Sequence, residues 1–395
     1  MISVAEARNI MIGCTEPLAV ERVGLREAQG RTLREQVVAE RAQPPFRASA
    51  MDGYALRSAD TPGILKLVGE AGAGRALDRP LAAGECARIF TGAPLPVNAD
   101  AVLIQEDAER SGDQVTAPAV EPGRHVRATG VDFSRGRILL EPGRILDAPA
   151  LALAAAAGRP TLAVSRPPRV AIFSGGDEIV SPGQAPSPEQ IFDSVSFGVA
   201  ALAENWGGQA TTADPLSDDE PSIADAIKAA IGGHDLIVLI GGASVGDHDH
   251  ARPAVRGLGG ELLFEKVALR PGKPTWFARL GAQSVLGLPG NPASAFVCAR
   301  LFLRPLLDRL CGRDPTASWR TTLAAARRPL AANGARETYL RACTGIDETA
   351  QYWTEAAPNQ DSSLLSVFIG ANALILRPPN APAAPAGALV ETLPF

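Results

Sequence analysis

A glycine-rich segment with closely spaced acids directly follows an apolar run in this chain. Residues 235–240 read Asp-Leu-Ile-Val-Leu-Ile, and residues 241–250 read Gly-Gly-Ala-Ser-Val-Gly-Asp-His-Asp-His. A short apolar run of this kind is typical of a buried strand. The glycines after it let backbone N–H groups approach an anion, and acids two residues apart suit coordination of a hard cation. The segment therefore predicts a site for phosphate and a metal ion.

Two more loops follow apolar runs in the same part of the chain. Residues 174–178 (Ser-Gly-Gly-Asp-Glu) come after the run at 170–173, and residues 289–293 (Pro-Gly-Asn-Pro-Ala) come after the run at 284–288. In the second loop, Asn291 is expected to cap a helix whose first residue is Pro292. A single glycine turn is more often structural than functional. Three such loops at the carboxyl edge of one parallel sheet predict a ligand site.

Three cations occur within eight residues, at Lys266, Arg270 and Lys273, in a segment stiffened by prolines and a glycine. Taken alone, such a run is most simply a solvated basic turn. Beside three glycine loops, it favours an oxyanion site in which Arg270 can bind two oxygens at once.

The candidate metal ligands are acids, because magnesium prefers carboxylate oxygens. Asp218 and Asp219 have an alternative role as helix caps. His248 and His250 flank Asp249, which leaves a transition-metal site open, but a surface or packing role for these histidines is favoured because no third ligand is near in sequence. The magnesium set comprises Glu178, Asp218, Asp219 and Asp249.

Composition and charge limit the class of protein. The 395 residues carry a net charge of -5, without the basic excess of a nucleic-acid or acidic-membrane binder. No apolar run approaches the roughly 18 residues of a membrane helix, and the first residues lack a signal-peptide pattern. The five cysteines are scattered and form no CxxC pair. We expect a cytoplasmic protein that binds neither nucleic acid nor membrane.

The alternation of apolar runs and helical patterns predicts a multidomain α/β chain. Residues 168–317 are expected to form a parallel-sheet α/β domain with helices on both faces. Residues 43–127 are expected to form a small β-rich domain, and residues 318–395 a C-terminal β module similar to a barrel. Residues 1–42 and 128–167 form an N-terminal or linker domain with helices, one of them between Asp147 and Gly158.

Together these segments resemble the molybdopterin molybdenumtransferase family, the MoeA proteins, which are related to the C-terminal part of gephyrin. The matching strings lie in the family's order along almost the whole chain. They are residues 49–55 (Ser-Ala-Met-Asp-Gly-Tyr-Ala), 91–94 (Thr-Gly-Ala-Pro), 130–132, 176–178, 241–246, 271–274 and 288–294.

The resemblance implies a homodimer whose site lies at the subunit interface. It implies that adenylylated molybdopterin and molybdate are the substrates, with magnesium as cofactor, and that the 168–317 domain binds molybdopterin. The residues carried over as catalytic are Asp52 and Thr91 from the partner subunit, Asp132, Glu178 and Asp249. Those carried over as substrate-binding are Gly241, Gly242, Ser244, Gly246, Lys266, Arg270, Lys273, Pro289, Pro292, Ser362 and Ser363.

The implied reaction inserts molybdenum into the dithiolene of the pterin and releases AMP. Because no serine or cysteine is paired with a histidine base in a nucleophile motif, we expect no covalent protein intermediate. Two alternatives stay open at this point: a molybdopterin adenylyltransferase, whose family shares the sheet domain, and a non-catalytic scaffold similar to gephyrin.

Overall fold

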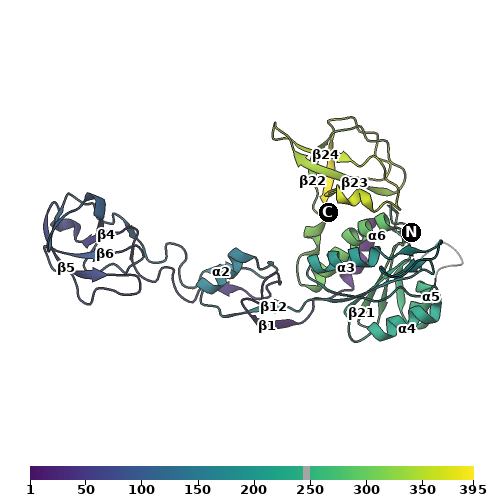
Figure 1. The fold of residues 1–395 in the computed structure, drawn as a ribbon, viewed down its shortest axis with the longest axis horizontal. Coiled ribbons are helices and arrows are strands. Elements are labelled where there is room, and N and C mark those ends of the chain that lie inside the picture. Colours follow the sequence, from purple (N-terminus) through teal and green to yellow (C-terminus); the bar gives the residue numbers. More distant parts are fainter. Residues whose placement is uncertain (243–249) are drawn as a thin grey trace. The chain divides into compact units, whose positions relative to one another are not determined.

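The computed structural model describes residues 1–242 and 250–395, which form two compact units (Figure 1). Unit 1 contains residues 1–22, 30–34 and 163–395, and unit 2 contains residues 23–29 and 35–162. The predicted four-part division is finer than this, and its boundaries stay predictions. Helix α1 (Val4–Gly13), however, belongs to unit 1, because Val4, Ala7 and Met11 pack in that unit's core.

A six-stranded sheet forms the centre of unit 1, in the order β16–β13–β17–β21–β20–β18. The first four strands are parallel, as predicted. Strand β20 runs antiparallel to β21, because the two are joined by a tight hairpin with Gly281 at a φ of 59°, and β18 pairs antiparallel with β20. The strands are β13 (Arg169–Ser174), β16 (Gln209–Thr212), β17 (Leu236–Ile240), β18 (Glu261–Phe264), β20 (Trp276–Leu280) and β21 (Gln283–Leu288).

Helices cover both faces of this sheet, and the central strand β17 shows why. Its residues alternate between two apolar clusters: Leu236, Val238 and Ile240 belong to one, and Ile237 and Leu239 to the other. A strand buried on both faces is the expected result of βαβ connections. The first cluster includes residues of α3 (Val195–Asn205), α6 (Pro292–Cys298) and α7 (Arg304–Leu310), and the second includes residues of α4 (Glu220–Ala230) and α5 (Ala251–Gly257).

The helix that follows β21 begins as predicted but is not regular. Asn291 occupies the N-cap position and Pro292 is the first residue, but the Asn291 side chain forms no capping hydrogen bond. A π-helical stretch, η3 (Ala299–Leu303), separates α6 from α7. Pro305 lies in the first turn of α7 and has no N–H for the regular helical hydrogen bond, which accounts for the interruption just before it.

The C-terminal part of unit 1 is a closed barrel, as the barrel-like prediction anticipated. Pairing of β23 with both β24 and β25 closes a ring in the order β23–β24–β22–β26–β25. The short strand β19 (Leu269–Arg270) joins from the sheet domain and pairs in parallel with β23, which places Arg270 beside Thr338. The barrel strands are β22 (Thr322–Ala326), β23 (Glu337–Ile346), β24 (Tyr352–Ala356), β25 (Ala373–Arg377) and β26 (Leu389–Pro394).

Unit 2 is β-rich, as predicted, and contains one α-helix among its described elements. Helix α2 (Ala148–Ala156) begins at Asp147, whose carboxylate accepts from the Ala150 N–H at 2.9 Å, and ends before Gly158 at a φ of 89°. Strands β1 (Val20–Gly24) and β12 (Thr161–Ser165) lie where the chain passes between the units.

A six-stranded sheet in the order β7–β4–β6–β5–β9–β8 forms most of unit 2. Its strands are β4 (Gly53–Leu56), β5 (Gly63–Ala71), β6 (Glu85–Ile89), β7 (Ala101–Ile104), β8 (Glu109–Ser111) and β9 (Gln114–Ala117). Two strand pairs accompany it: β3 (Ala48–Ser49) with β10 (Val126–Arg127), and β2 (Val37–Val38) with β11 (Ile138–Leu140). In the described part of the chain, no helix is long and apolar enough to cross a bilayer.

The strand that carries the third loop depends on a glycine. A Cβ on Gly287 in β21 would lie 2.0 Å from ring atoms of Trp276, which is fully buried. We predict that Gly287→Ala lowers the free energy of unfolding by about 1–3 kcal/mol, the usual cost of overpacking. The matched control is Gly334→Ala, because a Cβ there meets nothing within 4 Å. Equal thermal unfolding midpoints for the two variants would contradict the prediction.

Candidate functional site

The three predicted loops meet at the carboxyl edge of the parallel strands, and they meet backbone to backbone. A Cβ on Gly241 would lie 2.6 Å from the carbonyl oxygen of Gly175, and a Cβ on Gly290 would lie 3.4 Å from the Cα of Gly241. The Gly175 N–H donates to the Ile240 carbonyl at 3.0 Å, and the Gly241 N–H donates to the Leu288 carbonyl at 3.1 Å. A side chain at position 241 would separate the loops, so glycine is required there for their contact.

A cavity of about 540 Å³ lies where these loops meet, and we call it the sheet-edge pocket. The predicted residues Glu178, Gly241, Gly242, Pro289 and Pro292 line it, and so does Asp218. Its wall on the α3 side is formed by residues 191–195, which include the short strand β15 (Ile191–Phe192), paired in parallel with β14 (Ile179–Val180). The structure therefore brings together most of the described residues that the sequence predicted at this edge.

The two adjacent aspartates at the start of α4 have different roles. Asp219 caps the helix: its carboxylate accepts from the N–H and the hydroxyl of Ser222, both at 2.8 Å, and these bonds lower its pKa. Asp218 lines the sheet-edge pocket, and its Oδ1 is buried without a hydrogen-bond partner among the described residues. A buried carboxylate oxygen with no donor is a costly arrangement that a cation would relieve.

The described residues at this pocket supply only some of the oxygen ligands that a magnesium ion needs. Glu178 and Asp218 line the same cavity, and both offer the oxygen ligands that magnesium prefers. Among the described residues, no group of three acidic, histidine or cysteine side chains is close enough to hold a metal ion. Asp249, another predicted ligand, lies outside the described residues, as do Ser244, Gly246, Asp247 and His248.

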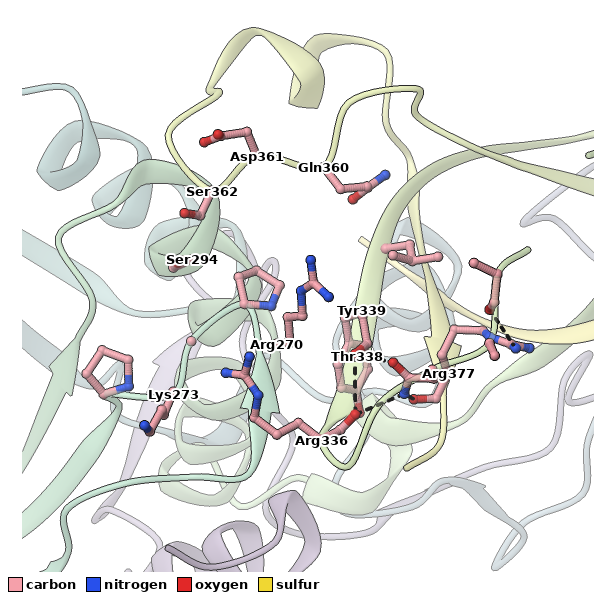
Figure 2. A pocket seen from close by; sticks show the side chains of 17 residues that line it. Arg270, Lys273, Ser294, Arg336, Thr338, Tyr339, Gln360, Asp361, Ser362 and Arg377 are labelled. Atoms are coloured by element: carbon pink, nitrogen blue, oxygen red, sulfur yellow. Dashed lines mark hydrogen bonds between the residues drawn. The ribbon is translucent and has the colours of Figure 1, made fainter. Parts of the chain in front are cut away.

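A second cavity, of about 600 Å³, lies between the sheet domain and the barrel, and we call it the barrel pocket (Figure 2). Its lining carries four cationic side chains and one carboxylate. That carboxylate, Asp361, accepts from the N–H and hydroxyl of Ser363, and these bonds lower its pKa. The pocket therefore has an excess of positive charge in a chain whose net charge is -5. The four cations are Arg270, Lys273, Arg336 and Arg377.

The cations of the barrel pocket differ in the hydrogen bonds and ion pairs that they already form within the protein. Figure 2 shows Arg270 and Arg336 within the pocket. Arg336 donates one bond to the Leu269 carbonyl at 3.2 Å, and in the described chain neither Arg270 nor Lys273 forms an ion pair. Arg377 donates to the carbonyls of Ala331 and Pro382. The predicted residue Lys266 lines neither pocket.

The two pockets are adjacent and share a wall. Ser294 and Pro274 line both, while Ser362 lines the barrel pocket and Ser363 the sheet-edge pocket. Ser362 also joins the barrel to the start of α6: its hydroxyl accepts from Asn291 Nδ2 at 3.0 Å, and its carbonyl accepts from the Ala293 N–H at 3.0 Å. Both predicted serines therefore reach the site.

The serine-bearing loop is held by a buried arginine on β23. Arg341 is 1% exposed and donates to the Gln360 side chain at 3.2 Å and to the Asp361 carbonyl at 2.8 Å. Burial lowers the pKa of this guanidinium. Because its partners are neutral acceptors on one short loop, its bonds fix the position of that loop against α6.

Three predicted catalytic residues lie in unit 2. The carboxylate of Asp52 accepts from the N–H of Thr91 at 2.7 Å and from its hydroxyl at 2.8 Å, and these two bonds lower its pKa. Asp52 and Thr91 are exposed and thus form one bonded pair at the surface of their unit. Asp132 is also exposed, on a separate turn.

Comparison with known proteins covers the entire arrangement. Residues 2–158 match the model of the MoeA N-terminal region (domain I and II), residues 171–309 that of the probable molybdopterin binding domain, and residues 324–395 that of the MoeA C-terminal region (domain IV). A molybdopterin molybdenumtransferase of Nostoc is 34% identical over 96% of this chain and 90% of its own length. One from Haemophilus influenzae is 31% identical over 100% of this chain and 99% of its own. The chain belongs to the MoeA family.

Solved structures agree with this membership. A molybdopterin biosynthesis MoeA protein of Pyrococcus horikoshii superimposes with a TM-score of 0.85 and 30% identity, covering 100% of this chain and 99% of its own. A second MoeA structure from that organism gives a TM-score of 0.84 at 25% identity, with 100% of both chains covered. The expected MoeA fold is confirmed.

Sequence reasoning missed several residues of this MoeA site. Arg336, Ser294 and Gln360 line the barrel pocket. An isolated arginine before a strand has no spacing signal, and only the pairing of β19 with β23 brings Arg336 near Arg270. Arg341 could have been noticed as a charged residue at an inward position of a strand, but its loop partners depend on the barrel's closure.

The different roles of the paired aspartates can be separated by substitution. We predict that Asp218→Asn weakens magnesium binding, measured by calorimetry on the full chain, without lowering the thermal unfolding midpoint, because it replaces a carboxylate whose Oδ1 is buried without a partner among the described residues. Asp219→Ala should lower the midpoint and leave magnesium affinity unchanged, because it removes the cap of α4. The reverse pattern would contradict this assignment.

Proposed function

We propose that this chain inserts molybdenum from molybdate into adenylylated molybdopterin and releases AMP. Membership of the MoeA family makes it a transferase of molybdenum cofactor biosynthesis. Beyond this membership, we propose that the pterin substrate is adenylylated, that molybdate supplies the metal, that magnesium is the cation and that the chain forms a homodimer. The cytoplasmic location also stays a prediction.

The observation that carries the proposal is the positively charged barrel pocket next to the glycine loops. Molybdate is a doubly charged oxyanion, and guanidinium and ammonium groups without carboxylate partners suit it. In this proposal, Arg270, Lys273 and Arg336 bind molybdate, with Ser362 and Ser294 on the wall that separates it from the second substrate. Lys266 has no role in this proposal, because it lines neither pocket.

The sheet-edge pocket is the proposed site of the adenylylated pterin. Its glycine loops let the phosphate approach the backbone closely, and the wall shared with the barrel pocket brings the dithiolene next to molybdate. Glu178 and Asp218, with Asp249 added, would hold magnesium. When bound there, the ion would neutralise charge on the phosphate of the leaving AMP. The protein's own contribution is positioning and charge, with no covalent intermediate.

Enzymatic turnover separates this proposal from its alternatives. The full chain, supplied with adenylylated molybdopterin, molybdate and magnesium, should release AMP only when molybdate is present. An adenylyltransferase would instead consume ATP and adenylylate unmodified molybdopterin, and a scaffold would do neither. Either result would overturn the proposed reaction.

Arg336 provides a specific test of the oxyanion site. We predict that Arg336→Met raises the KM for molybdate about 10- to 100-fold, the usual loss for one or two hydrogen bonds to a charged group, with a smaller change in kcat. Arg320→Met is the matched control, because Arg320 is exposed and lines neither pocket. An unchanged KM in Arg336→Met, or the same rise in the control, would contradict the assignment.

The proposed homodimer places Asp52 and Thr91 in the partner subunit's site. Asp52→Ala and Glu178→Ala should each abolish AMP release, because each removes a side chain that every site needs. In a symmetric dimer, mixing and exchanging the two inactive variants should restore about a quarter of wild-type activity, because half of the dimers are mixed and each has one intact site. Exchange of subunits without any recovery would show that Asp52 acts within its own chain.

A further inference from the structure

Two large apolar side chains stay exposed at the mouth of the sheet-edge pocket. Ile191 is 60% exposed and Phe192 is 48% exposed, and both line the pocket. Ile179 and Val195 line the same wall. Apolar surface in a cavity of ligand size that also has polar groups in its lining is characteristic of a binding site.

The strand that carries this pair is tied in place. The Ile191 N–H donates to the Glu178 carbonyl and the Asp193 N–H to the Val180 carbonyl, both at 2.8 Å. The buried carboxylate of Asp193 accepts from the hydroxyl of Ser174 at 2.6 Å and from that of Ser196 at 2.5 Å. These bonds join β15 to β13 and to the first turn of α3. Rotating the apolar pair into the core would break a buried polar cluster, so the pair is held at the mouth of the pocket.

We infer that Ile191 and Phe192 form a platform on which a flat heteroaromatic ring of the substrate stacks. The inference rests on the proposed function, which gives the substrate two such rings, the pterin and the adenine. A ring laid on this platform would lie in the same cavity as the glycine loops and Asp218, so its attached phosphate remains within that cavity. Phe192 provides the aromatic face, and Ile191 lines the same cavity beside it.

The platform would determine specificity for a planar ring rather than take part in the chemistry. Stacking on an aromatic side chain tolerates any π-system, and its strength depends on the area of contact. Phe192 therefore contributes to binding affinity, while the polar loops orient the phosphate.

Equilibrium binding to the full chain tests the platform with two separate probes, AMP and unsubstituted pterin. We expect Phe192→Ala to weaken the binding of one probe about 5- to 100-fold, and the affected probe identifies the ring. Phe192→Trp should retain wild-type affinity. Phe197→Ala is the matched control, because Phe197 is 55% exposed on the neighbouring helix α3 but does not line the pocket.

The remaining outcomes overturn the platform. Two of them concern binding: equal affinities in wild type and Phe192→Ala, or no binding of either probe to wild type. The third is a fall in the molar mass in solution of both Phe192→Ala and Phe197→Ala, which would make this surface a contact between subunits. If only the platform is wrong, the wild type still releases AMP from adenylylated molybdopterin, and Phe192→Ala has an unchanged KM for that substrate. If the proposed function is wrong, the wild type itself releases no AMP.

Discussion

Direct contact between three backbone turns is the constraint on which the site depends. Gly175, Gly241 and Gly290 lie at the ends of three parallel strands, and there is no room for a side chain between Gly175 and Gly241. Parallel strands end at one edge, so any loop that follows them competes for the same space. Glycine resolves the competition by letting the loops touch, and it leaves a cavity beside them rather than a layer of side chains.

The barrel adds what the sheet edge lacks, which is positive charge. The two-residue strand β19 carries Arg270 out of the sheet domain and pairs it with β23, next to Arg336. Arg341 then holds the loop that carries Ser362 against the first turn of α6. A glycine-lined pocket that carries carboxylates and a cationic pocket are thereby held on either side of one wall. The proposed reaction needs this arrangement, because a nucleotide-linked pterin and a free oxyanion must meet without sharing a site.

Much of this architecture could be predicted from sequence because its signals are local. Asp147 as a cap, Asn291 followed by Pro292, and the glycines after buried strands each report on a few neighbouring residues, and the structure confirms the helix starts and the meeting of the loops. The antiparallel edge of the sheet, the π-helical stretch before Pro305 and the role of Arg336 depend on long-range pairing, which short patterns do not report. Asp218 and Asp219 look alike in sequence, and only the orientation of α4 separates cap from pocket wall.

The central claim is that molybdate binds in the barrel pocket beside the glycine loops. It is tested most directly by crystals of the full chain grown with molybdate, measured at the molybdenum absorption edge. The account predicts an anomalous difference peak among Arg270, Lys273 and Arg336, retained in Arg320→Met crystals and lost from Arg336→Met crystals. A molybdenum peak elsewhere, with none in the barrel pocket at saturating molybdate, would contradict it.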